Sequence, residues 1–181
     1  CPDCAVNISL CDSTSSRGEI CAILPDGESG VSYDQDVTFR FPRRFTLQQG
    51  DTIPGTIFVF PALPGLPAVI VMDILKVKLD SIGGLPAGLS WECDSSANGC
   101  VYIPGANQQH GCVKICGTID CDASGNSPLT FYFTYTYDGQ DFLDAINGGI
   151  PVPIPLPTEL PTLTPYNVAF NIQTVAGGTL G

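Results

Sequence analysis

The chain has 181 residues and a formal net charge of −11, from 18 acidic and 7 basic residues. Binding to nucleic acid phosphates needs basic stripes, so this balance excludes nucleic acid and disfavours an anionic membrane surface. Glycine and proline together number 36 and only 14% of residues are charged, which is typical of many short strands joined by turns. No run approaches the ~18 apolar residues of a membrane-spanning helix, because prolines and glycines interrupt the closest one, 53–72.

Residues 1–25 are predicted to form a cysteine-rich N-terminal arm. Alternating apolar residues in 5–10 predict a short strand, which is stable only if it is crosslinked or lies along a sheet. Clustered cysteines indicate an oxidising compartment, and a first residue other than Met indicates a processed, secreted chain. The apolar residues are Val6, Ile8 and Leu10, and the cysteines of the arm are Cys1, Cys4, Cys11 and Cys21.

Residues 26–181 are predicted to form a two-sheet β-sandwich. Strands are expected at 31–41, 56–60, 74–81, 89–93, 111–118 and 129–137, because apolar and β-branched residues alternate or cluster there. The first of these strands has an imperfect phase at 34–36, which predicts a bulge. Its core candidates are Val31, Tyr33, Val37, Phe39 and Phe41, and those of the last are Phe131, Phe133, Tyr135 and Tyr137.

The C-terminal part combines a proline-rich stretch with a final strand. Six prolines in 148–165 predict an extended, polyproline-like arm. Residues 166–174 then alternate as a strand, with Tyr166, Val168, Phe170 and Ile172 on one face. Helical periodicity is absent throughout, so the predicted class is all-β.

The central stretch carries a series of motifs in a fixed order. An Asp-Ser-Ile strand end at Asp80–Ile82 is followed by Gly-Leu-Pro-x-Gly at 84–88 and then by Cys93. The Gly-Leu-Pro-x-Gly turn should break the strand, because proline lacks a hydrogen-bond donor and glycine permits positive φ. A loop to Cys100 follows and the chain returns through Gly-Cys-Val at 111–118, which suggests two β-hairpin arms stapled by cysteines. The last motif of the series is Pro-Leu-Thr at 128–133.

These motifs resemble immunoglobulin-like modules of secreted Bacteroidetes surface proteins, often cargo of the type IX secretion route. The resemblance covers about residues 74–137 and extends to the last strand. It implies an immunoglobulin-like sandwich at the cell surface and no particular ligand. The extra cysteines Cys116 and Cys121 and the cysteine-rich start depart from the family pattern.

Nine cysteines leave one without a partner in the chain, either free or in an intermolecular bridge. Local bridges Cys93–Cys100 and Cys116–Cys121 are expected from their short loops, while Cys1, Cys4, Cys11, Cys21 and Cys112 stay unassigned. The alternative is a zinc site, since His110, Cys112, Cys116 and Cys121 have suitable ligand types. Oxidised cysteines are the stronger expectation, so no metal is predicted.

No catalytic residue and no cofactor is predicted. His110, the single histidine, lacks a local partner for nucleophilic catalysis, and no acidic pair stands out as a glycosidase pair. Asp34 with Asp36, or Asp120 with Asp122, has oxygen ligands for Ca²⁺, but outside any repeat, and solvated loop charge is the preferred interpretation.

Modification and glycan binding are the remaining candidates. The resemblance implies O-glycosylation at Asp-Ser/Thr motifs, with acceptors Ser13, Thr52 and Ser81, and Asn7-Ile8-Ser9 fits an N-glycosylation motif. A possible aromatic platform for sugar rings comprises Trp91, Tyr102, Tyr132, Tyr135 and Tyr137, part of which is expected to serve the core.

The preferred function is a secreted structural protein that assembles with copies of itself into a surface filament. The odd cysteine and a mean hydropathy of +0.21 favour apolar surface covered by neighbours. Either the strand over Val6, Ile8 and Leu10 or the strand 166–174 is a candidate to complete a neighbour's sheet, the first being the better donor and the second expected to pair within its own domain. The alternative is an adhesive or carbohydrate-binding module of a larger surface protein.

Overall fold

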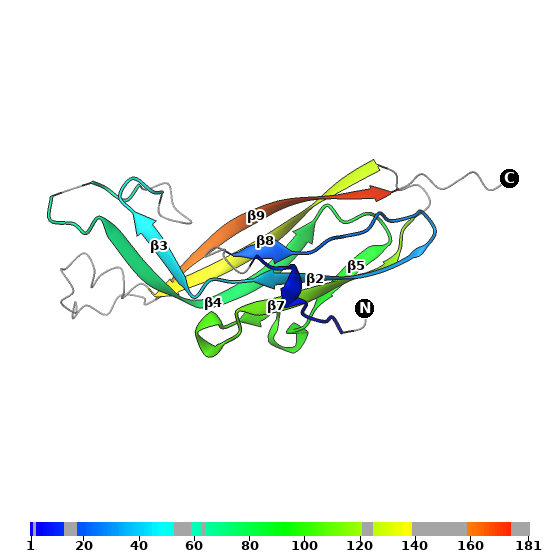
Figure 1. Cartoon of the computed structure of the whole chain (residues 1–181), viewed down its shortest axis with the longest axis horizontal. Coiled ribbons are helices and arrows are strands. Elements are labelled where there is room, and N and C mark those ends of the chain that lie inside the picture. The colour runs from blue at the N-terminus through cyan, green and yellow to red at the C-terminus, as the bar shows by residue number, and fades with distance from the viewer. Residues whose placement is uncertain are drawn as a thin grey trace.

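The computed structural model describes residues 1, 3–12, 18–52, 59–62, 64–120, 125–138 and 159–174, and of 125–126 and 159–174 the backbone alone. Strands of two antiparallel sheets make up most of this part of the chain (Figure 1). The other regular elements are three short 3-10 turns, η1 (Ile8–Leu10), η2 (Ser96–Asn98) and η3 (Pro104–Ala106). Among the described residues, no helix has the length and apolar character needed to cross a membrane.

The first sheet has four strands in the order β1-β2-β7-β5. Every neighbouring pair is antiparallel, and β2 and β7 are in unbroken register from Ser32 opposite Thr118 to Arg40 opposite His110. The strands are β1 (Glu19–Cys21), β2 (Ser32–Arg40), β5 (Leu89–Cys93) and β7 (His110–Thr118).

The second sheet follows the order β3-β4-β8-β9, and the short β6 pairs with β4. The fifteen-residue β4 has three partners, because its first part pairs with β3 and its later part with β8 and β6. The strands are β3 (Arg44–Gln48), β4 (Val69–Gly83), β6 (Val101–Tyr102), β8 (Gly125–Asp138) and β9 (Glu159–Thr174). In Figure 1, β3 and the adjoining part of β4 extend at one end of the molecule.

The two sheets share one aromatic core. Alternation along β2 and β8 turns every second side chain inward, as the sequence predicts. Phe133 of β8 lies with its ring centroid 5.6 Å from Phe39 and 5.4 Å from Phe41, both in edge-to-face contact across the sheets. The predicted inward residues of β8 are all buried, namely Phe131, Phe133, Tyr135 and Tyr137.

Glycines mark the crossing between the sheets. The strand β4 ends at Gly83 and β5 begins at Leu89, so the predicted break is where the sequence places it. Gly84 and Gly88 have φ of +81° and +87°, and a Cβ at Gly84 would collide with the carbonyl oxygen of Pro128. The strands on either side of this break lie in different sheets, because β4 pairs with β8. The two predicted hairpin arms do pair with each other, β5 antiparallel to β7.

Two expectations for the first long strand are wrong. Val31 is 47% exposed because it precedes β2, whereas the other four core candidates are buried. No bulge interrupts 34–36, since β2 and β7 keep one register there and the two aspartates simply face outward. Most of the strand predicted at 56–60 lies outside the described residues. Its described residue Val59 forms an isolated bridge with Thr52.

Candidate functional site

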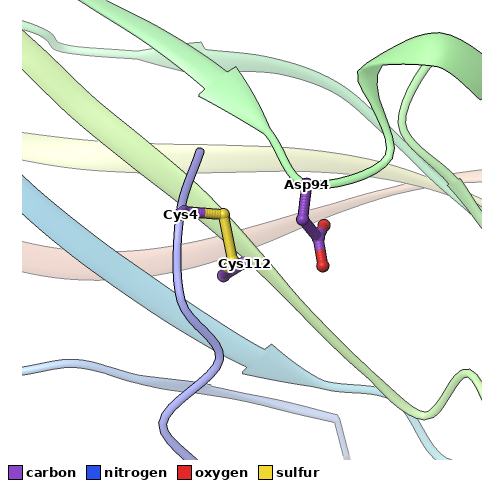
Figure 2. A group of neighbouring side chains, drawn as sticks. All are labelled: Cys4, Asp94 and Cys112. Atoms are coloured by element: carbon purple, nitrogen blue, oxygen red, sulfur yellow. A yellow bond between two sulfur atoms is a disulfide. The ribbon is translucent and has the colours of Figure 1, made fainter. Parts of the chain in front are cut away.

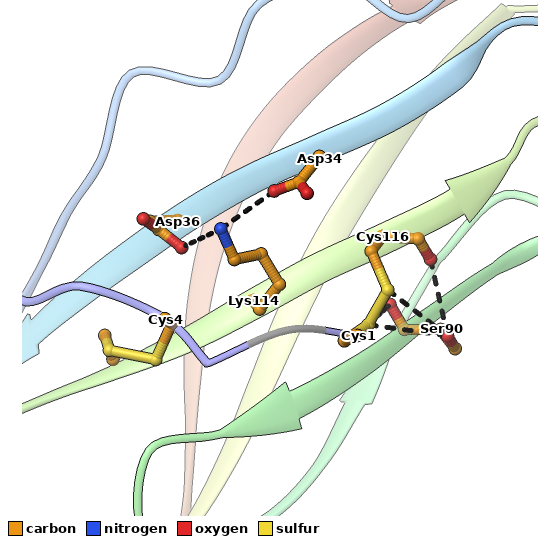
Figure 3. Close-up of polar contacts among 8 residues, drawn as sticks. Cys1, Cys4, Asp34, Asp36, Ser90, Lys114 and Cys116 are labelled. Carbon is orange, nitrogen blue, oxygen red and sulfur yellow. Dashed lines mark hydrogen bonds and ion pairs between the residues drawn. A yellow bond between two sulfur atoms is a disulfide. The ribbon is translucent and has the colours of Figure 1, made fainter.

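The N-terminal arm lies across the outer face of the first sheet, and we call residues 1–12 the strap. Three disulfides hold it there. Cys1 is bonded to Cys116 and Cys4 to Cys112, both on β7 (Figures 2 and 3). The third bridge joins Cys11 of the strap to Cys21 of β1.

The sheet register explains this path. Cys112 lies opposite Thr38 of β2, and Thr38 lies opposite Cys21 of β1, so the three side chains form a row on the face away from the core. The strap is bonded to both ends of this row, through Cys4 to Cys112 and through Cys11 to Cys21. Between these bridges the backbone N–H of Asn7 donates to Thr38 Oγ1 at 2.8 Å. As a result Thr38 is 1% exposed and Cys112 is fully buried, although both face away from the core.

The strap corrects two predictions. Residues 5–10 are not a strand, because Asn7 caps the 3-10 turn η1 by accepting a hydrogen bond from the Ser9 N–H. Cys116 is bonded to Cys1, so the expected bridge to Cys121 is wrong. The structure does pair Cys93 with Cys100, as their spacing predicts. The four bridges use eight of the nine cysteines, and the ninth, Cys121, lies outside the described residues.

The strap leaves an apolar ridge in solvent. Val6, Ile8 and Leu10 are 43%, 61% and 42% exposed. Because bridges at Cys4 and Cys11 fix both ends of this ridge to its own sheet, it is not free to add as a strand to a neighbour. The preferred donor segment of the sequence interpretation is therefore wrong.

A partly buried cation, Lys114, lies beside the strap on the same sheet face. Lys114 Nζ is 2.8 Å from Asp34 Oδ1 and 2.8 Å from Asp36 Oδ1, and its side chain is 11% exposed (Figure 3). Hydrogen bonds to Asp34 and then Asp36 raise the pKa of Lys114. The Lys114 ammonium group therefore lies between the carboxylates of Asp34 and Asp36, where the Ca²⁺ alternative would place the metal ion. Asp120 is exposed, and Asp122 lies outside the described residues.

Two clusters bring together the residue types of a metal site. They are Cys4, Asp94 and Cys112 (Figure 2), and Cys11, Glu19 and Cys21. In each cluster the two sulfur atoms are bonded to each other, so neither offers a thiolate. Of the zinc alternative, Cys112 is bonded to Cys4 and Cys116 to Cys1, so neither offers a thiolate and the oxidised structure does not support that site.

The aromatic platform is not assembled. Tyr102, Tyr135 and Tyr137 are 3%, 4% and 5% exposed and belong to the core. The two remaining candidates are partly exposed but lie in different sheets, Trp91 on β5 and Tyr132 on β8. Tyr102 tolerates burial because its hydroxyl donates to Asp94 Oδ1 at 2.6 Å.

We expect the free energy of unfolding to fall between pH 10 and 12. Burial, and then Asp94, raise the pKa of Tyr102, while burial and then Asp26 raise the pKa of Tyr33 to about 12. A phenol with a raised folded-state pKa leaves stability intact below pH 10, and that stability is lost as the pH rises through the folded pKa. Each tyrosine contributes a slope of about 1.4 kcal/mol per pH unit.

Urea unfolding across this pH range checks the expectation, on a Cys121→Ser background that removes the one cysteine outside the four bridges. Tyr33→Phe and Tyr102→Phe should each make the free energy of unfolding fall less steeply with pH. Lys114 adds a further part of the slope, because its pKa is raised and its stabilisation is also lost with rising pH. An unchanged slope in both single variants would contradict the assignment.

An open groove of about 1240 Å³ lies at the end of the first sheet near β3. Its lining includes Arg40, Arg43, Arg44 and His110, yet each arginine already has a partner. Arg40 pairs with Glu19, Arg44 with Asp73, and Arg43 donates to Asn107. Burial, and then the nearby Arg40, lower the pKa of His110. The groove therefore contains a histidine that is neutral at pH 7 and three arginines that already have ion-pair or hydrogen-bond partners.

The structure describes two of the three O-glycosylation candidates. Ser81 is exposed on β4 beside a register shift, and Thr52 is exposed in its bridge with Val59. Ser13 lies outside the described residues. The Asn7 carboxamide oxygen accepts hydrogen bonds from the Ser9 N–H and hydroxyl, so it is engaged within its own motif.

The last strand is the second assembly candidate. It is longer than predicted, because β9 starts at Glu159 and thereby takes in the end of the expected proline arm, while residues 148–158 lie outside the described part. The backbone of β9 pairs with β8 of its own chain, with Tyr166 opposite Phe131 and Ile172 opposite Ser127. Within the described residues β8 is its one strand partner, so β9 forms the edge of the second sheet.

Comparisons with known proteins return no similar protein: no family model, no curated protein and no solved structure matches the chain.

Proposed function

We propose that this protein is an extracellular structural subunit that assembles with copies of itself into a surface filament through strand addition. In this proposal the two sheets form an immunoglobulin-like sandwich of the kind found in Bacteroidetes surface proteins. The motif order in 74–137 supports that relationship, as do the antiparallel sheets around one core. The filament is the function, and no catalytic step is involved.

The observation that carries the proposal is the edge formed by β9. The strand has sixteen residues, well above the usual strand length of five or six. Its outer side presents a row of backbone N–H and C=O groups that the described residues leave without a strand partner. Such a long edge is a ready template for pairing with another chain. A contact repeated head to tail without closure builds a fibre.

Other features support an extracellular setting. Four disulfides form and persist in oxidising compartments. Val6, Ile8 and Leu10 of the strap gain burial when copies pack side by side. The proposal also includes O-glycosylation at Ser13, Thr52 and Ser81, of which Thr52 and Ser81 are exposed.

A carbohydrate-binding surface module is the second candidate, and its support is weaker. Of the five aromatic residues that suggest it, Tyr102, Tyr135 and Tyr137 are committed to the core. Trp91 and Tyr132 remain as separate contacts on different sheets. Glycan-array binding that is lost in Trp91→Ala would favour this candidate.

We expect ordered fibres in negative-stain electron microscopy of the non-reduced protein. A variant with Ala169→Lys and Asn171→Lys places two charges on the edge strand and should abolish the fibres, because edge lysines oppose strand addition. The matched control adds the same charge at exposed turn positions, Asn98→Lys and Ala106→Lys, and should keep them. Monodisperse particles of the unaltered protein at all concentrations would refute the filament.

A further inference from the structure

We infer that Asn7 of the strap carries an N-linked glycan, attached through its side-chain nitrogen Nδ2. The chain has seven asparagines, and Asn7-Ile8-Ser9 is the one place where Ser or Thr follows an asparagine at the second position after it. This acceptor motif is used on exposed segments of secreted proteins, so its surroundings in the structure decide whether it is suitable. The inference concerns the single chain and does not depend on the proposed filament.

The surroundings of the motif are those of an exposed segment in an oxidised protein. Asn7, Ile8 and Ser9 are all exposed. Disulfides at Cys4 and Cys11 flank the motif and fix it on the outer face of the first sheet. Disulfides persist in secretory compartments and outside the cell, where N-linked glycans are also found. The motif therefore meets both conditions, an oxidising compartment and an exposed asparagine.

The Asn7 side chain uses its oxygen and leaves its nitrogen available. The oxygen Oδ1 accepts from the Ser9 N–H at 3.2 Å and from the Ser9 hydroxyl at 2.6 Å, which caps η1. The backbone N–H of Asn7 donates to Thr38 Oγ1 and anchors the strap to β2. Within the part of the chain that the structure describes, Nδ2 makes no hydrogen bond. Both protons of Nδ2 are therefore spare donors on an exposed side chain.

Attachment of a sugar leaves these three hydrogen bonds in place. The anomeric carbon of the first sugar forms a bond to Nδ2, and its bond to the phosphate oxygen of a lipid-linked pyrophosphate donor breaks. The pyrophosphate leaves with the electron pair, and one amide proton passes to a base of the transferase. The product is a secondary amide whose oxygen still accepts from Ser9. The cap of η1 and the contact with Thr38 are thus compatible with the glycan.

A glycan at this position also accounts for the apolar ridge of the strap. Val6, Ile8 and Leu10 are 43%, 61% and 42% exposed, although the strap is bonded to its own sheet on both sides of them. Such a group of exposed apolar side chains marks a surface that is covered by something else. Sugar rings have apolar C–H faces, and rings attached at Asn7 start between Val6 and Ile8. The glycan is then the cover that each copy of the chain carries itself.

Peptide mass spectrometry of the protein purified from its own source tests this inference. After reduction, cleavage at Arg17 gives the peptide 1–17, which contains the whole motif. We expect this peptide to carry sugar mass, and fragment ions should place the sugar on Asn7. The same peptide contains Ser13, so the fragment ions also separate an N-linked sugar from O-glycosylation of the proposed function.

Four variants made in the same source separate the glycan from the capping role of Asn7. Asn7→Asp keeps an oxygen that caps η1 but removes Nδ2, and Ser9→Ala removes the hydroxyl that the acceptor motif requires. Both should lose the sugar on residue 7 completely. Ser9→Thr preserves the motif, and Asn98→Gln changes an exposed asparagine outside it. Both should keep the sugar.

The outcomes are distinct. An unmodified Asn7 in the unaltered protein would overturn the inference, and sugar on Ser13 alone would overturn it while leaving the proposed O-glycosylation standing. Sugar that persists on the strap of Asn7→Asp at the same mass would also contradict it. The non-reduced mass of each variant shows whether the four bridges have formed, so loss of the sugar is not confused with misfolding.

Discussion

Removing both strap bridges to β7 should lower the free energy of unfolding by about 7 kcal/mol in the chain-entropy model. The variant replaces Cys1, Cys4, Cys112 and Cys116 by Ser. The Cys4–Cys112 bridge spans 108 positions, and closing a loop of that size is worth about 4.8 kcal/mol. Once it is closed, the Cys1–Cys116 bridge closes only a small remaining ring of about eight residues, worth about 2.5 kcal/mol.

This nesting makes the two bridges non-additive in a measurable way. Removing either pair alone should cost only about 2.5 kcal/mol, because the surviving bridge still closes the long loop. Urea unfolding of the non-reduced variants gives the three values. Cys93→Ser/Cys100→Ser is the matched control, since it removes one bridge over seven positions and should also cost about 2.5 kcal/mol. A loss near 5 kcal/mol from one β7 pair alone would contradict the nested arrangement.

Phe133→Ala should cost 3 to 5 kcal/mol, roughly the range for a large aromatic side chain removed from a core. Phe133 is 2% exposed, and its ring contacts Phe39 of β2, Phe41 just after β2 and Tyr135 of its own strand. Its removal leaves a cavity at the contact between the two sheets, and neighbouring rings fill such a cavity only in part.

Denaturant unfolding at neutral pH measures this loss. Val71→Ala is the control, because Val71 is 48% exposed on β4 and its truncation should stay within about 0.5 kcal/mol. Equal losses in the two variants would mean that the sheets do not share the aromatic core described above.

Strand positions could be predicted where alternation is strict. Every second residue of 131–137 is apolar, and all four lie in the core, because a single phase satisfies the whole strand. The turn at Gly84–Gly88 could be predicted from backbone freedom alone. Which sheet each flanking strand joins could not, since strand partners are set by contacts distant in sequence.

The strap shows why the candidate site could not be predicted. Eight cysteines allow 105 pairings, and local spacing favours short loops such as 116–121 over the bridges to Cys1 and Cys4. Alternation at Val6, Ile8 and Leu10 resembles a strand, but covalent bonds at both ends and the Asn7 cap favour a 3-10 turn. Tyrosine is equally ambiguous in sequence, because a single hydroxyl partner such as Asp94 decides whether Tyr102 can be buried.

The strap also constrains the order in which bridges form when the reduced chain is oxidised. Cys1 and Cys4 lie more than a hundred positions from their partners at 116 and 112. Their first neighbours are each other and Cys11, so early oxidation yields wrong bridges that must be exchanged later. We therefore expect the slow phase of oxidative refolding in vitro to follow bridge exchange rather than strand pairing.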